Sequence, residues 1–283
     1  MPRGIPKSGA RADRPLPRPF IKWAGGKSQL IDALAPHLPA EFGTYHEPFV
    51  GAGALFFALS RVGRLRRAVL SDTNTRLLAT WRGVRDSVEP LIERLASMPY
   101  DKDLFLAQRA RAIDGEDDLE IATWFIYLNK TGFNGLYRVN RSGQFNVPFG
   151  RYDNPNICDA PALRAASRAL QGVEICREDF SAVLDRAQPG DLVYFDPPYV
   201  PLSQSSSFTA YTQDGFTLND QRRLHTVASR LKARGVHVLL SNSSSPSVDE
   251  LYAEGFTVHR VPATRSINSK GDARGPVDEL III

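Results

Sequence analysis

The sequence holds no apolar run that approaches the ~20 residues a membrane-spanning helix needs. Its first residues lack the apolar core of a signal peptide, and its two cysteines, Cys158 and Cys176, lie far apart without a CxxC pair. These absences argue against a membrane-spanning chain and against a disulfide-rich scaffold. We therefore expect a cytoplasmic protein without a structural metal, whose 283 residues suffice for one large domain and an inserted smaller one.

Two nucleotide-binding fingerprints each lack a glycine. Segment 20–28 ends in Gly-Lys-Ser like a P-loop, but Ile21 stands where the P-loop requires glycine, so we do not expect ATP binding. A turn between an expected strand and helix carries Gly51 and Gly53 but not the third glycine of the dinucleotide fingerprint. Pyrophosphate binding is therefore disfavoured, and a smaller cofactor that carries a nucleoside is expected.

Charge is unevenly distributed. The formal net charge of +4 comes from residues 1–19, which hold five basic side chains and one acidic side chain, so the remainder is neutral overall. We expect residues 1–18 to form a disordered basic tail. By contrast, segment 121–152 contains no Asp or Glu and interleaves basic side chains with aromatic ones. Such a mixture suits phosphates and bases.

Apolar runs and helical patterns alternate along the chain, which indicates an α/β fold with a Rossmann-like sheet. We expect strands at residues 44–48, 67–70, 173–176, 192–195, 237–240, 256–261 and 279–283. A helical pattern from Thr75 to about Leu128 interrupts the sheet as an insertion, and residues 161–170 again look helical. Residues 218–233 suit a helix with Thr217 as a possible N-cap and Gly235 after its end.

Asp196-Pro197-Pro198-Tyr199 closes the apolar run 192–195. Ligands of open α/β sheets gather at the carboxyl ends of strands, and consecutive prolines remove backbone donors, so this turn presents mostly acceptors. The Asp196 carboxylate and the Pro197 carbonyl could accept both N–H bonds of an exocyclic amine while Tyr199 stacks on the ring. Taken alone, the motif fits a solvated strand end about equally well.

Three further residues suit a cofactor that carries a nucleoside. Asp72 ends the second expected strand, 19 residues after Gly53, where a carboxylate can receive ribose hydroxyls. Trp23 could cover an adenine or a sulfonium, and Lys27 could hold a carboxylate. Without the other motifs, this segment would equally suit a helix start with a solvated Lys27 and a buried Trp23.

Six segments form a family signature in a characteristic order: Phe20–Lys27, Glu47–Gly53, Ser71–Asn74, Tyr127–Tyr152, Asp196–Tyr199 and Arg265–Leu280. Together they resemble the Dam-type DNA adenine-N6 methyltransferases, the α-class or D12 family. The resemblance spans nearly the whole chain after residue 18, and its most specific part is the run 127–152.

The resemblance implies an S-adenosylmethionine-dependent methyltransferase fold with an inserted, mainly helical target-recognition domain. The catalytic domain would comprise residues 19–74 and 159–283, and the DNA-recognition domain residues 75–158. The implied reaction transfers a methyl group from S-adenosylmethionine, without a metal, to adenine N6 in double-stranded DNA, ordinarily within GATC and by base flipping. The implied protein is monomeric, cytoplasmic, and bacterial or phage-encoded.

The resemblance also assigns residues to roles. The catalytic turn would be Asp196, Pro197, Pro198 and Tyr199. The cofactor site would contain Trp23, Lys27, Gly51, Gly53, Asp72 and Asp196. The DNA-binding residues would be Lys22, Phe133, Asn134, Leu136, Arg138, Asn140, Pro148, Arg151 and Tyr152. In one departure, Phe133 stands where the best-known members have the Tyr that inserts into the duplex, so stacking is kept and a hydroxyl is lost.

Other functions compete with adenine methylation. Cytosine-N4 methylation is the nearest, because both exocyclic amines present similar donors and the motif chemistry does not fully separate them. A DNA-binding protein without catalysis would be expected to carry damage at Trp23, Lys27, Asp72 or Asp196, and none is damaged. A nicotinamide oxidoreductase is disfavoured by the missing glycine.

Overall fold

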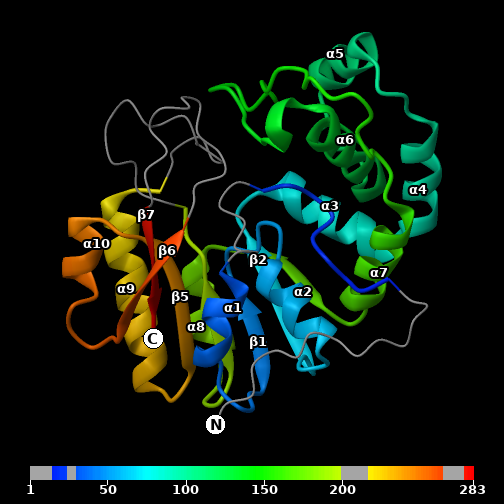
Figure 1. The fold of residues 1–283 in the computed structure, drawn as a ribbon. Coiled ribbons are helices and arrows are strands. Elements are labelled where there is room, and N and C mark those ends of the chain that lie inside the picture. The colour runs from blue at the N-terminus through cyan, green and yellow to red at the C-terminus, as the bar shows by residue number, and fades with distance from the viewer. Residues whose placement is uncertain (1–14, 24–29, 199–215, 264–276) are drawn as a thin grey trace.

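The computed structural model describes residues 15–23, 30–198, 216–263 and 277–283. Its centre is a seven-stranded sheet of order β3-β2-β1-β4-β5-β7-β6, in which β7 runs antiparallel to both neighbours (Figure 1). The strands are β1 (Thr44–Glu47), β2 (Arg67–Asp72), β3 (Glu174–Arg177), β4 (Leu192–Phe195), β5 (His237–Ser243), β6 (Val258–Ala263) and β7 (Val277–Ile282). All seven expected strands are confirmed, with β6 displaced by two residues, and the expected α/β Rossmann-like fold is confirmed with them.

Helices connect the strands and form the insertion. The α-helices are α1 (Ile31–Leu34), α2 (Ala54–Arg61), α3 (Thr75–Asp86), α4 (Val88–Ser97), α5 (Lys102–Ala110), α6 (Asp118–Thr131), α7 (Ala160–Leu170), α8 (Val183–Arg186), α9 (Leu218–Ala233) and α10 (Pro246–Leu251). Short 3₁₀ turns are η2 (Ala35–His37), η3 (Phe133–Gly135) and η4 (Phe180–Ala182). Of the helices that the structure describes, none has both the length and the apolar character needed to cross a bilayer.

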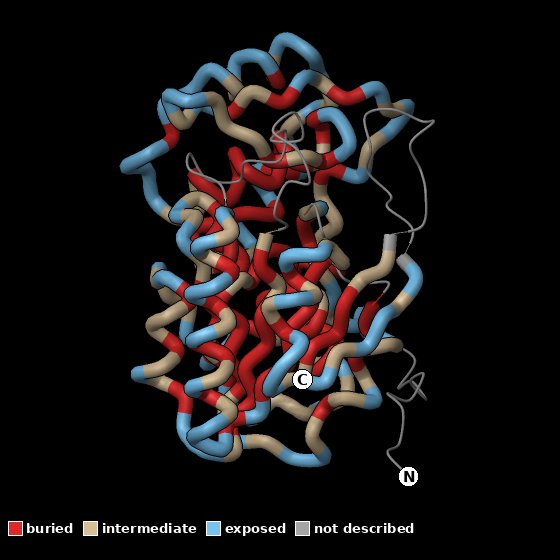
Figure 2. The backbone as a smooth tube through the Cα atoms, turned by 90° about the vertical axis from the view of Figure 1, so that its left-hand side faces the viewer, coloured by how far each residue is buried: buried red, intermediate tan, exposed pale blue. Residues whose placement is uncertain are grey.

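The sheet is covered on both faces, as the buried residues along its strands show (Figure 2). In β4, Leu192 and Tyr194 join the core beneath α1, α2, α3 and α7, whereas Val193 and Phe195 join the core beneath α8, α9 and α10. Side chains alternate between the faces of a strand, so a strand with helices on both sides must be apolar throughout. This is why residues 192–195 form an unbroken apolar run.

The larger core continues from the sheet into the insertion. Trp81 of α3 is fully buried and belongs to the same apolar cluster as Trp124 and Phe125 of α6. The helices α3 and α6 approach closely at Gly83, where a Cβ would collide with α6. Because α3 packs on both the sheet and α6, no break in packing marks residue 75, and the proposed domain boundaries stay predictions.

Local signals at α9 are confirmed in detail. The Thr217 hydroxyl accepts from the backbone N–H of Asp220, whose carboxylate in turn accepts from the Thr217 N–H, forming a capping box. Gly235 follows the helix with a φ of 79°, a left-handed conformation that favours glycine. The last residues of the expected tail, 15–18, are described, and Arg18 forms an ion pair with Asp159 at the start of α7.

The packing of Gly53 generates a stability prediction. Gly53 caps α2 with a φ of 65°, and a Cβ there would collide with the Trp81 ring. We expect Gly53→Ala to lower the free energy of unfolding by about 2–5 kcal/mol, from left-handed strain plus overpacking. Gly172→Ala is the matched control, because Gly172 has a φ of 75° with nothing within 4 Å of the added Cβ. Urea denaturation measures the free energy of unfolding of both variants. Equal losses in Gly53→Ala and Gly172→Ala would show that the contact with Trp81 adds no cost.

Candidate functional site

Polar side chains meet at the carboxyl ends of adjacent strands. Glu47 ends β1, Asp72 ends β2, and Asp196 directly follows β4, while β1 lies between β2 and β4. Ser241 lies on the neighbouring β5. This edge is the place where an α/β sheet binds its ligands. The structure therefore brings together Asp72 and Asp196, which the sequence predicted as cofactor and catalytic residues.

Asp196 is held by a chain of hydroxyl groups. The Ser241 hydroxyl donates to Asp196 Oδ1 at 2.8 Å and lies 2.9 Å from the Tyr194 hydroxyl. Tyr194 and Ser241 are buried, and Asp196 is only partly buried. The carboxylate is thus fixed in direction by a neighbouring strand while it keeps access to solvent. Pro197 and Pro198 extend the turn from this point.

A second carboxyl group, that of Glu47, lies deeper in the site. It is 2% exposed and accepts a hydrogen bond of 2.9 Å from the Tyr45 hydroxyl. Burial, helped by the negative charge of Asp196 and opposed by hydrogen bonds from Tyr45 and the Phe56 amide, raises the pKa of Glu47 to about 8. Glu47 is therefore mostly protonated at neutral pH.

Asp72 is held by the backbone of two turns. Its carboxylate accepts from the Asn74 N–H at 2.9 Å, and the Asn74 side chain caps α3 by accepting from Leu77. Burial raises the pKa of Asp72 to about 6, and hydrogen bonds from the amides of Asn74, Gly51 and Thr73 restrain the rise. The glycine turn after β1 therefore contacts the carboxylate that ends β2.

The glycine turn lies between two indole rings. Trp81 Nε1 donates to the Gly51 carbonyl at 3.1 Å, and a Cβ on Gly51 would lie 2.8 Å from Cδ1 of Trp23. Gly51 and Gly53 both have positive φ, at 46° and 65°. A bare backbone turn beside an indole, with the Asp72 carboxylate at its edge, suits a nucleoside that carries a ribose and a cationic sulfonium. The donor set therefore fits S-adenosylmethionine.

The acid-free segment folds as a hairpin of residues 132–149, which follows α6. Isolated bridges pair Gly132 with Phe149 and Val139 with Phe145. At its tip, Asn140 Oδ1 accepts from the amides of Ser142 and Gln144. Asn140, predicted to bind DNA, thus also shapes the turn that ends the hairpin.

Phe133 stands at the base of the hairpin and is 46% exposed, which is unusual for a large apolar side chain. It begins η3, and its N–H donates to the Pro148 carbonyl at 2.9 Å. The next residue, Asn134, has a φ of 55°, and no other described residue except glycine has a positive φ. A tight turn therefore presents an aromatic ring to solvent, as an inserting side chain requires.

Arg138 is already oriented by a neighbour on the hairpin. Its Nε donates to Asn146 Oδ1 at 2.7 Å, and its Nη2 donates to the Asn146 carbonyl at 3.1 Å. One edge of the guanidinium fork is therefore fixed, and the side chain remains partly exposed. This arrangement limits the directions in which Arg138 can point.

Lys22 lies against the hairpin although it is far away in sequence. Its Nζ sits 5.5 Å from the centroid of the Tyr152 ring, and a Cβ on Gly135 would lie 2.5 Å from its Cδ. Among the remaining predicted DNA-binding residues, Pro148 and Arg151 are exposed to solvent, whereas Leu136 is partly buried. Lys27 and Tyr199 lie outside the described residues, so their predicted roles stay predictions.

The sequence-based assignment of site residues gave no role to Asn129 or Tyr137, but the structure places both in contact with residues of the candidate site. Asn129 is 2% exposed in α6 and bonds to the backbone of both Lys22 and Gly135. The Tyr137 ring stacks on Trp23, with centroids 5.6 Å apart. The signal in the sequence was their place inside the run 127–152, which alone does not reveal a partner.

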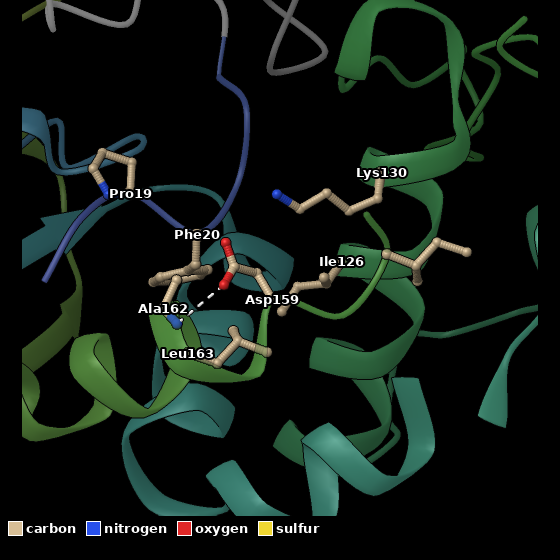
Figure 3. A pocket seen from close by; sticks show the side chains of 8 residues that line it. Pro19, Phe20, Ile126, Lys130, Asp159, Ala162 and Leu163 are labelled. Atoms are coloured by element: carbon tan, nitrogen blue, oxygen red, sulfur yellow. Dashed lines mark hydrogen bonds between the residues drawn. The ribbon is translucent and has the colours of Figure 1, made fainter. Parts of the chain in front are cut away.

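Two cavities lie away from this edge. One has a volume of about 20 Å³, close to that of one water, and lies between Phe20, Lys130 of α6 and Asp159 at the start of α7 (Figure 3). The other, of about 360 Å³, opens where β4 and β5 begin, at Leu192 and His237. Neither adjoins the carboxylates at the strand ends, and the first is too small for a base.

Comparison with known proteins identifies the family. Residues 23–267 match the sequence model of the D12 class N6 adenine-specific DNA methyltransferases. The Type II methyltransferase M1.LlaDCHI of Lactococcus lactis subsp. cremoris is 43% identical over 273 residues, covering 94% of each chain. M.MjaIII of Methanocaldococcus jannaschii is 40% identical, covering 94% of this chain and 98% of that relative. The DNA adenine methylase of Escherichia coli K12 is 36% identical, with 94% and 95% covered.

Among solved structures, the precorrin-6y C5,15-methyltransferase of Geobacter metallireducens GS-15 aligns with 90% of this chain and 87% of its own. Its TM-score of 0.38 and identity of 10% are too low to support an argument. The family match and the relatives decide between the competing functions, because both name adenine N6 or DNA methylation. The chain therefore belongs to the D12 class of N6 adenine-specific DNA methyltransferases, enzymes that depend on S-adenosylmethionine.

Proposed function

We propose that the protein methylates adenine N6 within GATC in duplex DNA, after the target base has been flipped out of the stack. The observation that supports the chemistry is the Asp196 carboxylate, fixed by Ser241 at the end of β4 and followed by the Pro197 carbonyl. Supporting the site preference is the hairpin, which carries Arg138 and the exposed Phe133 next to Lys22. We further propose that the enzyme acts as a cytoplasmic monomer.

The acceptors at the turn activate the adenine amine. Its nitrogen lone pair is delocalised into the ring, so the amine is a poor nucleophile until that conjugation weakens. Asp196 and the Pro197 carbonyl accept the two N–H bonds and favour a pyramidal nitrogen, an interaction that strengthens as positive charge develops. S-adenosylmethionine, when bound, supplies an electrophilic methyl group. Trp23, the glycine turn and Asp72 would hold it in line with the amine.

Glu47 supports this role by staying neutral. Two ionised carboxylates at one site would repel each other and raise the cost of ionising either. Because the pKa of Glu47 is about 8, the site does not hold a second anion beside Asp196 at neutral pH. Glu47 would thus serve as a protonated, buried acid and Asp196 as a partly buried acceptor, because neighbouring carboxyl groups in different surroundings can take different roles.

The hairpin supplies DNA recognition. Flipping costs stacking energy, and an aromatic side chain inserted into the duplex offsets part of it. Phe133 has the exposure for this insertion. Arg138 suits the O6 and N7 acceptors of guanine, and Asn146 holds the fork in place for them. Exposed Arg151 suits phosphate oxygens.

The decisive experiment maps methylation. Purified protein is incubated with unmethylated plasmid DNA and S-adenosylmethionine, and modified adenines are located by sequencing. We expect N6-methyladenine at GATC. Modification of adenine at another sequence would overturn the proposed site preference alone, and modification of no adenine would overturn the proposed activity.

Replacing the catalytic carboxylate tests the chemistry. We expect Asp196→Asn to lower kcat about 100-fold or more while duplex affinity stays within about threefold, because the charge acts on the amine rather than on phosphates. Asp185→Asn, at an exposed position on α8, is the control and should keep parental activity. Single-turnover kinetics measure both variants. Activity of Asp196→Asn within tenfold of the parent would refute the assigned role.

Arg138 tests base reading. Arg138→Ala should lose about 1–3 kcal/mol of discrimination at one base pair of the site, seen as methylation of sequences altered there. Arg151→Ala is the matched control, because an exposed arginine that contacts phosphate should weaken binding to all sequences and reduce the salt dependence. If Arg138→Ala instead lowers methylation equally at every sequence, its reading role is wrong.

Glu47 predicts a pH-dependent stability. Its pKa is raised from 4.5 to about 8 in the folded protein, so its contribution to stability is present below pH 4.5 and is lost as pH rises through 8. Glu47→Gln cannot ionise, and the variant should gain stability relative to the parent as pH rises from 5 to 9. Urea denaturation across that range measures the difference. Glu41→Gln, at an exposed position, is the control for the loss of one carboxylate. A Glu47→Gln difference that does not change across this pH range would contradict the raised pKa of Glu47.

A further inference from the structure

The segment 21–23 belongs to two sites at once. Lys22 extends across Gly135 towards the Tyr152 ring, on the hairpin. Its neighbour Trp23 packs on Gly51, in the turn beside Asp72. One peptide bond therefore separates a side chain at the proposed DNA surface from one at the proposed cofactor site.

Asn129 ties the backbone of this segment to the hairpin. Its Oδ1 accepts from the Lys22 N–H at 2.9 Å, and its Nδ2 donates to the Lys22 carbonyl and to the Gly135 carbonyl, both at 2.8 Å. The residue is 2% exposed, so water cannot replace these bonds. Breaking them would leave buried polar groups unsatisfied, which makes the link stiff.

Tyr137 ties the hairpin to the cofactor side. Its ring packs in one cluster with those of Trp23 and Phe125, with centroids 5.6 and 4.8 Å away and planes within 24° and 15° of parallel, and the Trp23 and Phe125 centroids are 6.2 Å apart. Burial raises the pKa of Tyr137, and the positive charge of nearby Arg76 opposes the rise. The adjacent Arg138 is more exposed, so the hairpin turns one side chain inward and the next outward.

Arg76 completes the connection. Its Nη1 donates to the Gly143 carbonyl at the hairpin tip at 2.8 Å, and its guanidinium pairs with Asp114. Arg76 lies in the first turn of α3, immediately after the turn that holds Asp72. The hairpin is therefore attached to segment 21–23 at its base through Asn129 and at its middle through Tyr137, and its tip is attached to the start of α3 through Arg76.

We propose that Asn129 and Tyr137 are positioning residues that couple S-adenosylmethionine binding to DNA recognition. This inference rests on the proposed function. A cofactor packed against Trp23 restrains segment 21–23, and Asn129 and Tyr137 pass that restraint to Lys22 and to the hairpin that carries Phe133 and Arg138. Coupling is reciprocal, so DNA at the hairpin tightens cofactor binding by the same factor.

The test measures the coupling factor directly. Affinity for a duplex that contains the site methylated by the parent is measured with and without saturating S-adenosylhomocysteine, as is affinity for S-adenosylhomocysteine with and without the duplex. We expect the parent to show about a 5-fold to 150-fold tightening in both directions. Asn129→Asp keeps the acceptor for Lys22 and loses both donors, so its factor should fall below about twofold while S-adenosylhomocysteine alone binds within threefold of the parent.

Two further variants separate positioning from general stability. Thr123→Val removes a buried hydroxyl that bonds only within α6, to the Leu119 carbonyl, and should keep the parental coupling factor. Tyr137→Leu removes the ring stack on Trp23 and Phe125, and it should lower the factor at least threefold. If Asn129→Asp does not fold, the coupling factor of the Tyr137 variant alone tests the proposal.

The outcomes distinguish this inference from the proposed function. If the parent methylates adenine but shows no coupling, or if both variants keep the parental factor, the positioning roles are wrong and the methyltransferase activity stands. A parent that methylates at a sequence other than GATC loses only the proposed site preference, since the coupling is then measured on that duplex. A parent that methylates no DNA overturns both.

Discussion

Two indole rings enclose the glycine turn after β1, and the rest of the site depends on that packing. Trp81 bonds to the Gly51 carbonyl and fills the space beside Gly53, while Trp23 packs against Gly51. Trp81 belongs to α3, on which α4 and α6 of the insertion pack, and Trp23 leads into the contacts with the hairpin. The glycine turn is therefore the point at which the sheet, the insertion and segment 21–23 meet.

Burial at the strand ends sets the electrostatics of this site. Glu47 is enclosed and Asp72 is enclosed in part, so the pKa of each carboxyl group is raised, to about 8 and about 6 respectively. The backbone amides of the turns limit the rise at Asp72. Asp196, bonded to Ser241 and partly open to solvent, is the acceptor that we propose for the substrate amine. Adjacent carboxyl groups thereby serve different purposes because their surroundings differ.

Patterns that act over a few residues were predicted well from the sequence. The α9 helix has the expected bounds, its capping box forms at Thr217, and Gly235 takes the left-handed conformation after it. The apolar run 192–195 is a doubly covered strand with the Asp-Pro-Pro turn at its carboxyl end. The expected helical stretch from Thr75 is divided into four helices, because short turns between helices leave little trace in apolar periodicity.

The sequence by itself determined the α/β sheet, the glycine turn, the strand-end carboxylates and the family, since each is written in local spacing or in a contiguous motif. Only the tertiary structure decided that Asn129 holds Lys22, 107 residues away, and that Tyr137 stacks on Trp23. The reason is physical: a buried amide or an aromatic ring has the same local pattern whatever it contacts. Its partner is chosen by how α6 and the hairpin pack against the strand-end turns, which no short stretch of sequence encodes.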